Sequence, residues 1–70
     1  MATIKELRSA VRVSQLAVAR RARINRTRLS CAETGDLALA PAEERVIREV
    51  IGELARERFN HFLERLHETH

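Results

Sequence analysis

Residues 13–35 read VSQLAVARRARINRTRLSCAETG and contain two short helical patterns separated by a break of a few residues. Ser14 is a candidate helix N-cap, and apolar residues including Val18 and Ala19 follow it at helical spacing. This pattern predicts a helix over residues 15–22. Because Ala19 has almost no side chain, a second helix can approach closely at that point.

Asn25 opens the second helical pattern, since its side-chain oxygen can accept a hydrogen bond from an amide of the following turn. Ile24 precedes this cap and Leu29 lies four positions into the helix, which is the spacing of a hydrophobic staple. Gly35 suits the left-handed residue that ends many helices. A helix is therefore predicted over 26–34, and the short break before it has the length of a helix-turn-helix corner.

The outer face of the 26–34 helix has an unusual composition. If Leu29 points to the core, the 100° step of a helix places small or polar residues outside and arginines beside them at the N-terminal end. A DNA major groove is about 12 Å wide and accepts one such helix, and the arginine fork matches guanine or phosphate. The alternative is an ordinary surface helix that carries two arginines. The outer residues are Thr27, Ser30, Cys31 and Thr34, flanked by Arg26 and Arg28.

The charges divide unevenly along the chain. Residues 1–35 carry eight Lys and Arg against two Glu, a net charge of +6. Residues 36–70 carry five Arg against eight acidic residues, a net charge of −3. This split indicates that the N-terminal half meets a polyanion. Solvated helix faces of opposite sign are the alternative.

Helical patterns also flank this central stretch. Thr3 and Glu6 form a capping box, and the apolar residues after them predict a helix over about 4–12. Residues 36–40 form a connector. Pro41 then suits a first helical turn, and the acidic residues that follow it favour the positive end of the helix dipole.

From Pro41 the helical pattern continues to about Glu68, with Gly52 as the one point that could divide it into two helices. We expect a DNA-binding domain over residues 1–52 and a helical extension over 53–70. A core of three short helices cannot reach the apolar residues of the extension, so we expect the extension to pair with a second copy as a homodimer. Folding back onto the chain, or docking in a groove of another protein, are the alternatives. The pairing residues would be Ala55, Phe59, Phe62, Leu63 and Leu66.

Length and composition narrow the classes further. Seventy residues with 33% charged and 44% hydrophobic side chains describe one folded all-α domain at most. Cys31 is the single cysteine, and neither a signal peptide nor a membrane span is predicted, so a cytoplasmic, nucleoid-associated protein is expected. The chain has no glycine-rich phosphate loop, nucleophile-base arrangement or metal-ligand spacing. We therefore expect no enzyme activity, cofactor or metal.

The run from Val13 to Gly35 resembles, without a gap, the phage-repressor and Cro-like (XRE) helix-turn-helix family, and IKELR before it resembles that family's first helix. In that family a Ser/Thr-Gln pair opens the second helix, an apolar-Ala pair follows, and a turn leads to a polar helix that ends in Glu-x-Gly. The resemblance covers about residues 3–51. The matching residues here are Ser14 and Gln15, Val18 and Ala19, Ala22 before the turn, and Glu33 with Gly35.

The resemblance implies a sequence-specific DNA-binding transcription regulator, such as a repressor, with the 26–34 helix in the major groove of double-stranded DNA. It also implies a structural ion pair between Arg8 and Glu33. The residues expected to contact bases are Arg26, Thr27, Arg28, Ser30 and Cys31, and those expected to contact phosphates are Gln15, Arg12, Arg23 and Thr34.

The sequence departs from the family at two points. Arg23 occupies a turn position that is usually Gly, where a left-handed conformation would cost about 1–2 kcal/mol. One long helix also replaces the usual fourth and fifth helices. A different class of function is therefore kept open, namely a protein-interaction module such as an antitoxin or phage inhibitor that uses the long C-terminal helix.

Overall fold

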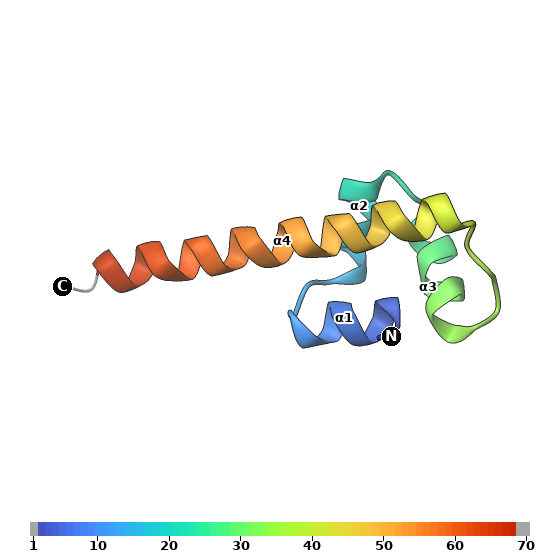
Figure 1. Ribbon diagram of the computed structural model, residues 1–70, viewed down its shortest axis with the longest axis horizontal. Coiled ribbons are helices and arrows are strands. Elements are labelled where there is room, and N and C mark those ends of the chain that lie inside the picture. Colours follow the sequence, from blue (N-terminus) through green and yellow to red (C-terminus); the bar gives the residue numbers. More distant parts are fainter. Residues whose placement is uncertain (1, 69–70) are drawn as a thin grey trace.

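The computed structural model describes residues 2–68, and this part of the chain contains four helices and no strand. The fold is all-α, as the sequence predicts. The three short helices gather around the first half of the long one, whose second half projects away from them (Figure 1). The helices are α1 (Ile4–Ala10), α2 (Gln15–Ala22), α3 (Arg26–Thr34) and α4 (Pro41–Glu68).

The capping box at the start of α1 is present. The Glu6 amide donates to Thr3 Oγ1 at 3.1 Å, and the Thr3 amide donates to Glu6 Oε1 at 2.9 Å. At its other end α1 stops at Ala10, two residues before the predicted end. The chain turns toward α2 there because Val13 enters the core, and Arg12 adopts a left-handed conformation with φ of 57° in this turn.

The corner between α2 and α3 follows the sequence prediction, and both helices have the predicted bounds. Asn25 Oδ1 accepts from the Thr27 amide at 2.7 Å, which caps α3. Arg23 takes the left-handed conformation that its position requires, with φ of 58°. The Ile24 amide then donates to the Ala19 carbonyl at 3.0 Å and closes the turn.

The long helix α4 is continuous through Gly52, so of the two arrangements that the sequence left open, one helix or two, the structure has one. Gly52 is exposed, and a Cβ built on it would meet nothing within 4 Å. No packing therefore bends or interrupts α4 at this residue. The expected boundary between residues 52 and 53 falls inside the helix.

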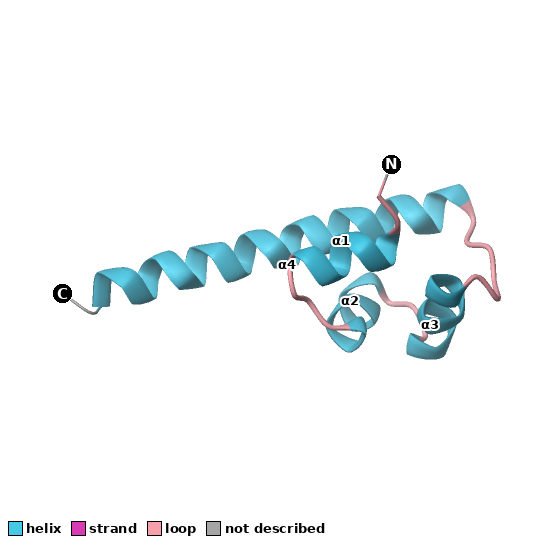
Figure 2. Ribbon diagram, turned by 90° about the horizontal axis from the view of Figure 1, so that it is seen from below, coloured by secondary structure: helices cyan, strands magenta, loops and turns pink. Residues whose placement is uncertain are grey.

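The hydrophobic core lies between the three short helices and the first half of α4 (Figure 2). Leu54 is the last large apolar side chain of α4 that packs on this core, and the side chains of residues 56–68 are exposed. The second half of α4 therefore does not fold back onto the chain. The buried core residues are Ile4, Val13, Val18, Ala19, Leu29, Ile47, Val50 and Ile51.

Candidate nucleic-acid interface

The orientation of α3 is fixed by Leu29, whose side chain is fully buried. The opposite side of α3 carries the expected outer residues. Arg26, Thr27 and Thr34 are exposed, and the smaller Ser30 and Cys31 are half-buried. The structure therefore presents a helix face that is cationic at its N-terminal end and small along its length.

An ion pair beneath α3 holds this helix on α1 and on the start of α2. Arg8 donates to both Glu33 oxygens at 2.8 Å, and it also donates to the Val13 carbonyl at 3.1 Å. The Glu33 side chain is only 2% exposed. Its hydrogen bond with Arg8 lowers the pKa of the Glu33 carboxyl, while burial acts in the opposite direction. The expected Arg8–Glu33 pair is therefore present, and the carboxylate remains charged.

Gln15 is part of the same network. Its Nε2 donates to Glu33 Oε1 at 3.0 Å, and its side chain is half-buried. The primary amide has a second hydrogen, which can still reach a ligand at the start of α2. The structure therefore places Gln15 beside the candidate interface while it also supports the ion pair.

Arg28 points to α4. It donates to Glu43 through Nη2 at 2.8 Å and through Nε at 3.0 Å, and Glu43 also accepts from the Ala40 amide at 3.1 Å. The hydrogen bond with Arg28 lowers the pKa of the Glu43 carboxyl. From the sequence we expected Arg28 to contact bases together with Arg26, and we did not expect its contact with Glu43. The one feature of the sequence that pointed to this contact was the acidic start of α4, which we attributed to the helix dipole.

Thr34 lies at the end of α3 farthest from Arg26. Its hydroxyl is 3.1 Å from the Cys31 carbonyl and 3.0 Å from Asp36 Oδ2. A neighbouring carboxylate disfavours a phosphate at this position, so Thr34 is the weakest of the expected phosphate contacts.

The remaining arginines of the N-terminal half fall into two groups. Arg21 donates to Glu57 at 2.8 Å and lies 3.4 Å from Glu53, so it links α2 to α4. Exposed arginines without an ion pair within residues 2–68 form the second group. These are available to a polyanion. They are Arg12, Arg20, Arg23 and Arg26.

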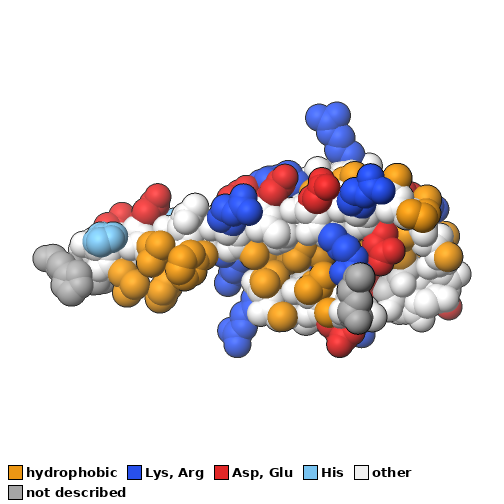
Figure 3. All heavy atoms as spheres, in the orientation of Figure 1, with side chains coloured by type: hydrophobic (Ala, Val, Ile, Leu, Met, Phe, Trp, Pro, Cys, Tyr) orange, Lys and Arg blue, Asp and Glu red, His pale blue; other side chains and the backbone are white. Residues whose placement is uncertain are grey.

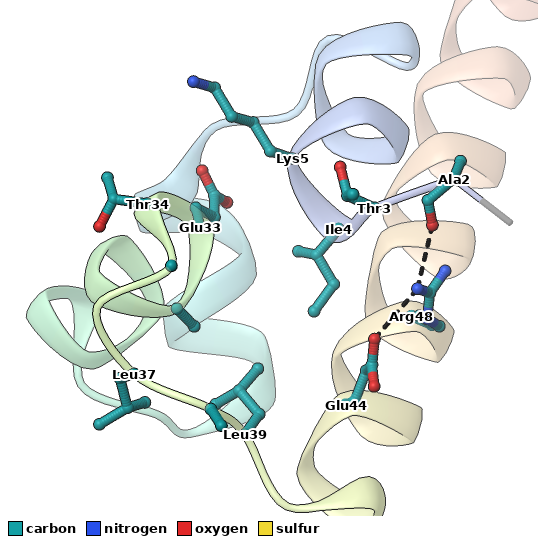
Figure 4. Close-up of a pocket in the computed structure, with 13 residues that line it drawn as sticks. Ala2, Thr3, Ile4, Lys5, Glu33, Thr34, Leu37, Leu39, Glu44 and Arg48 are labelled. Atoms are coloured by element: carbon teal, nitrogen blue, oxygen red, sulfur yellow. Dashed lines mark hydrogen bonds and ion pairs between the residues drawn. The ribbon is translucent and has the colours of Figure 1, made fainter.

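A recess of about 600 Å³ lies between the start of α1, the α3–α4 connector and α4. Ile4 and Leu39 contribute to its lining (Figure 4). Arg48 donates to the Ala2 carbonyl and to Glu44, both at 3.0 Å. Arg48 and Glu44, two charged residues of the lining, therefore pair with each other.

Residues 2–68 contain no group of three or more His, Cys, Asp or Glu side chains that could bind a metal ion. In the same residues no helix combines the length and hydropathy needed to span a bilayer.

Comparison of the chain with protein-family models, curated proteins and solved structures finds no match.

Proposed function

We propose that this protein is a sequence-specific DNA-binding transcription regulator that inserts α3 into the major groove. The observation that carries the proposal is the outer face of α3. Leu29 fixes the helix on the core, small side chains cover its middle, and Arg26 stands at its N-terminal end. The N-terminal residues of a recognition helix are the ones that usually meet base edges.

The contacts of the structure support a division of roles. Arg26 and Thr27 are exposed at the start of α3 and would read bases, while Ser30 and Cys31 are small enough to allow close approach. Exposed Arg12 and Arg23 lie before α2 and before α3 and would contact phosphates, together with the second amide hydrogen of Gln15. Phosphate contacts would set orientation and affinity, and α3 would set the sequence.

Arg28 has a different position in this scheme. Glu43 holds the Nε and Nη2 groups of its guanidinium and so fixes the direction of the side chain toward α4, which leaves fewer donors for a base than Arg26 has. We therefore assign base reading first to Arg26 and Thr27, and we assign Arg28 to holding the start of α3 against α4.

Binding measurements on arginine variants test the proposal. Arg26→Ala should cost about 1–3 kcal/mol and relax the preference at one base position. Arg45→Ala is the matched control, since Arg45 is an exposed arginine on α4 and should leave affinity unchanged. Equal affinities for the wild type and Arg26→Ala, with no base preference in either, would contradict the proposal.

The role of Arg28 can be separated with the same assay. If Arg28 holds α3 in place, Arg28→Ala and Glu43→Ala should lower affinity to a similar extent on every duplex, and the double variant should be little worse. If Arg28 instead reads a base, Arg28→Ala alone should relax one position of the preferred sequence.

A second candidate function is a protein-interaction module that acts through α4. The observation that favours it is the exposure of Phe59 and Phe62. Steep salt dependence with a base preference would favour the DNA-binding regulator. A stable complex with a cellular protein, without any DNA preference, would favour the interaction module.

A further inference from the structure

The projecting half of α4 carries a stripe of large apolar side chains that lies outside the core. Their spacing of three, four and seven residues puts them on one face of the helix. Hydrophobic side chains gather on the lower side of the projecting end, which is also the side on which α1 lies (Figure 3). The exposed fractions of these residues, which we call the stripe, are 58% for Phe59, 56% for Phe62, 38% for Leu63 and 46% for Leu66.

The size of the stripe indicates a weak interface. A large apolar side chain has an area of about 150–250 Å², so the exposed parts of the four residues sum to roughly 400 Å². Patches of this size on a small protein are often functional. Two such stripes would bury at most on the order of 800 Å² before arginine stems are added, which is below the roughly 1,000 Å² of a stable interface and fits only a weak one. Pairing of two stripes should therefore be weak, with a dissociation constant in the micromolar range.

We propose that the stripe pairs with the stripe of a second copy and that the two α4 helices run antiparallel. In the register that fits best, Phe59 lies opposite the partner's Phe62, and Ala55 lies opposite the partner's Leu66. Each layer then combines either two aromatic rings or one small and one large side chain, which fills the seam evenly. This pairing does not depend on the proposed DNA binding.

The position of α1 determines the antiparallel direction. Arg48 precedes Phe59 by three helical turns and so lies on the same side of α4. There Arg48 donates to the Ala2 carbonyl, and the first residues of α1 cover this side of the helix (Figure 1). Packed helices lie about 8–10 Å apart, so a parallel copy would collide with the start of α1. In the antiparallel register the partner's Glu68 lies opposite Glu53, and its described residues stop before Arg48.

The charges beside the stripe give this pairing a distinct salt dependence. On one side the stem of Arg56 would cover the partner's Leu63. On the other side Arg58 would lie near the partner's Arg65, and two like charges repel. Salt screens this repulsion, so the association should become tighter as salt is added. An acidic groove on another protein would show the opposite dependence.

Sedimentation equilibrium of the full chain without DNA, at concentrations up to about 200 µM, tests the pairing. The wild type and Asn60→Glu, a control that places the same carboxylate beside the stripe, should form dimers. Phe62→Glu should raise the dissociation constant by about 100-fold or more, because each dimer loses two aromatic contacts. Circular dichroism should show equal helix content in all three proteins. A monomeric wild type, or equal dimerisation of Phe62→Glu, would overturn the proposal.

Distances between spin labels test the direction. One spin label is attached to each copy at Arg45→Cys in a Cys31→Ser background. In the antiparallel dimer the two labels should lie about 45 Å apart along the helix axis, because a helix rises 1.5 Å per residue. A distance below about 25 Å would show a parallel arrangement and overturn the antiparallel one.

Dissociation on addition of salt would also contradict the proposed arginine contacts. DNA binding by a monomeric protein would leave the proposed function intact while refuting the pairing.

Discussion

Replacing Glu33 by alanine tests whether the ion pair beneath α3 holds the helix-turn-helix together. The Glu33 side chain is 2% exposed and accepts two hydrogen bonds from Arg8 at 2.8 Å and one from Gln15 at 3.0 Å. In Glu33→Ala the Arg8 guanidinium would retain the Val13 carbonyl as its one acceptor within residues 2–68. Removal of one member of a buried pair costs about 3–5 kcal/mol. Because Arg8 is still 16% exposed, we expect the lower end, about 3 kcal/mol.

This loss is large for a chain of 70 residues. At about 0.05–0.15 kcal/mol per residue, the free energy of unfolding is roughly 4–10 kcal/mol. A loss of about 3 kcal/mol should lower the Tm by about 12–24 °C, measured by circular dichroism at 222 nm during heating.

The matched control for this experiment is Glu57→Ala. Glu57 also pairs with an arginine, but its side chain is 56% exposed, and such pairs contribute little. The Tm of this variant should stay within a few degrees of the wild type. The double variant Arg8→Met/Glu33→Leu should recover much of the lost stability, since no unpaired charge remains. Equal Tm values for Glu33→Ala and Glu57→Ala would refute the reasoning.

Three further predictions concern stability. The pKa of the Glu33 carboxyl in the folded state is below the ordinary value of 4.5, so its contribution to the stability of the fold is present above that pH and is lost as pH falls through the lowered pKa. The Tm should therefore be flat from pH 7 to about 5 and should fall below about 4.5. In Glu33→Gln this fall should be smaller. Arg23→Gly should raise the Tm, because glycine adopts the left-handed conformation without the cost of about 1 kcal/mol that arginine has there. The same variant should bind DNA more weakly if Arg23 contacts phosphate. Gly52→Ala should stabilise α4 by about 0.5–1 kcal/mol in urea unfolding, because the added Cβ meets nothing; a loss of stability would contradict the straight, unpacked helix at Gly52.

The ends of the short helices could be predicted from sequence because short-range hydrogen bonds determine them. Thr3 with Glu6 and Asn25 with Thr27 each lie within three residues of each other, and Gly35 takes a left-handed conformation with φ of 88°. The turn position at Arg23 was identified through the family resemblance, where it is usually Gly, and the sequence left open whether Arg23 would accept a left-handed conformation; it does, with φ of 58°.

The contacts that cross the fold were predictable only in part. The Arg8–Glu33 pair followed from the resemblance to a known family, not from spacing along the chain. The Arg28–Glu43 pair joins residues far apart in sequence, and no local pattern distinguishes this glutamate from its neighbours. For the same reason the sequence could not separate Arg28 from Arg26, and both were expected to contact bases.

The early end of α1 has a similar origin. The apolar spacing continues past Ala10, and helix propensity alone gives no reason to stop. The chain turns there because Val13 enters the core and Arg8 donates to its carbonyl. The left-handed conformation of Arg12 is therefore a consequence of tertiary packing.

The most direct test of the account is selection of bound duplexes from a random pool at physiological salt, with the wild type and Arg26→Ala compared in parallel. We expect an enriched motif for the wild type, arranged as an inverted repeat. We also expect Arg26→Ala to lose the preference at one position of each half-site. An unenriched pool for the wild type, or an identical motif for both proteins, would contradict the claim that α3 reads DNA sequence.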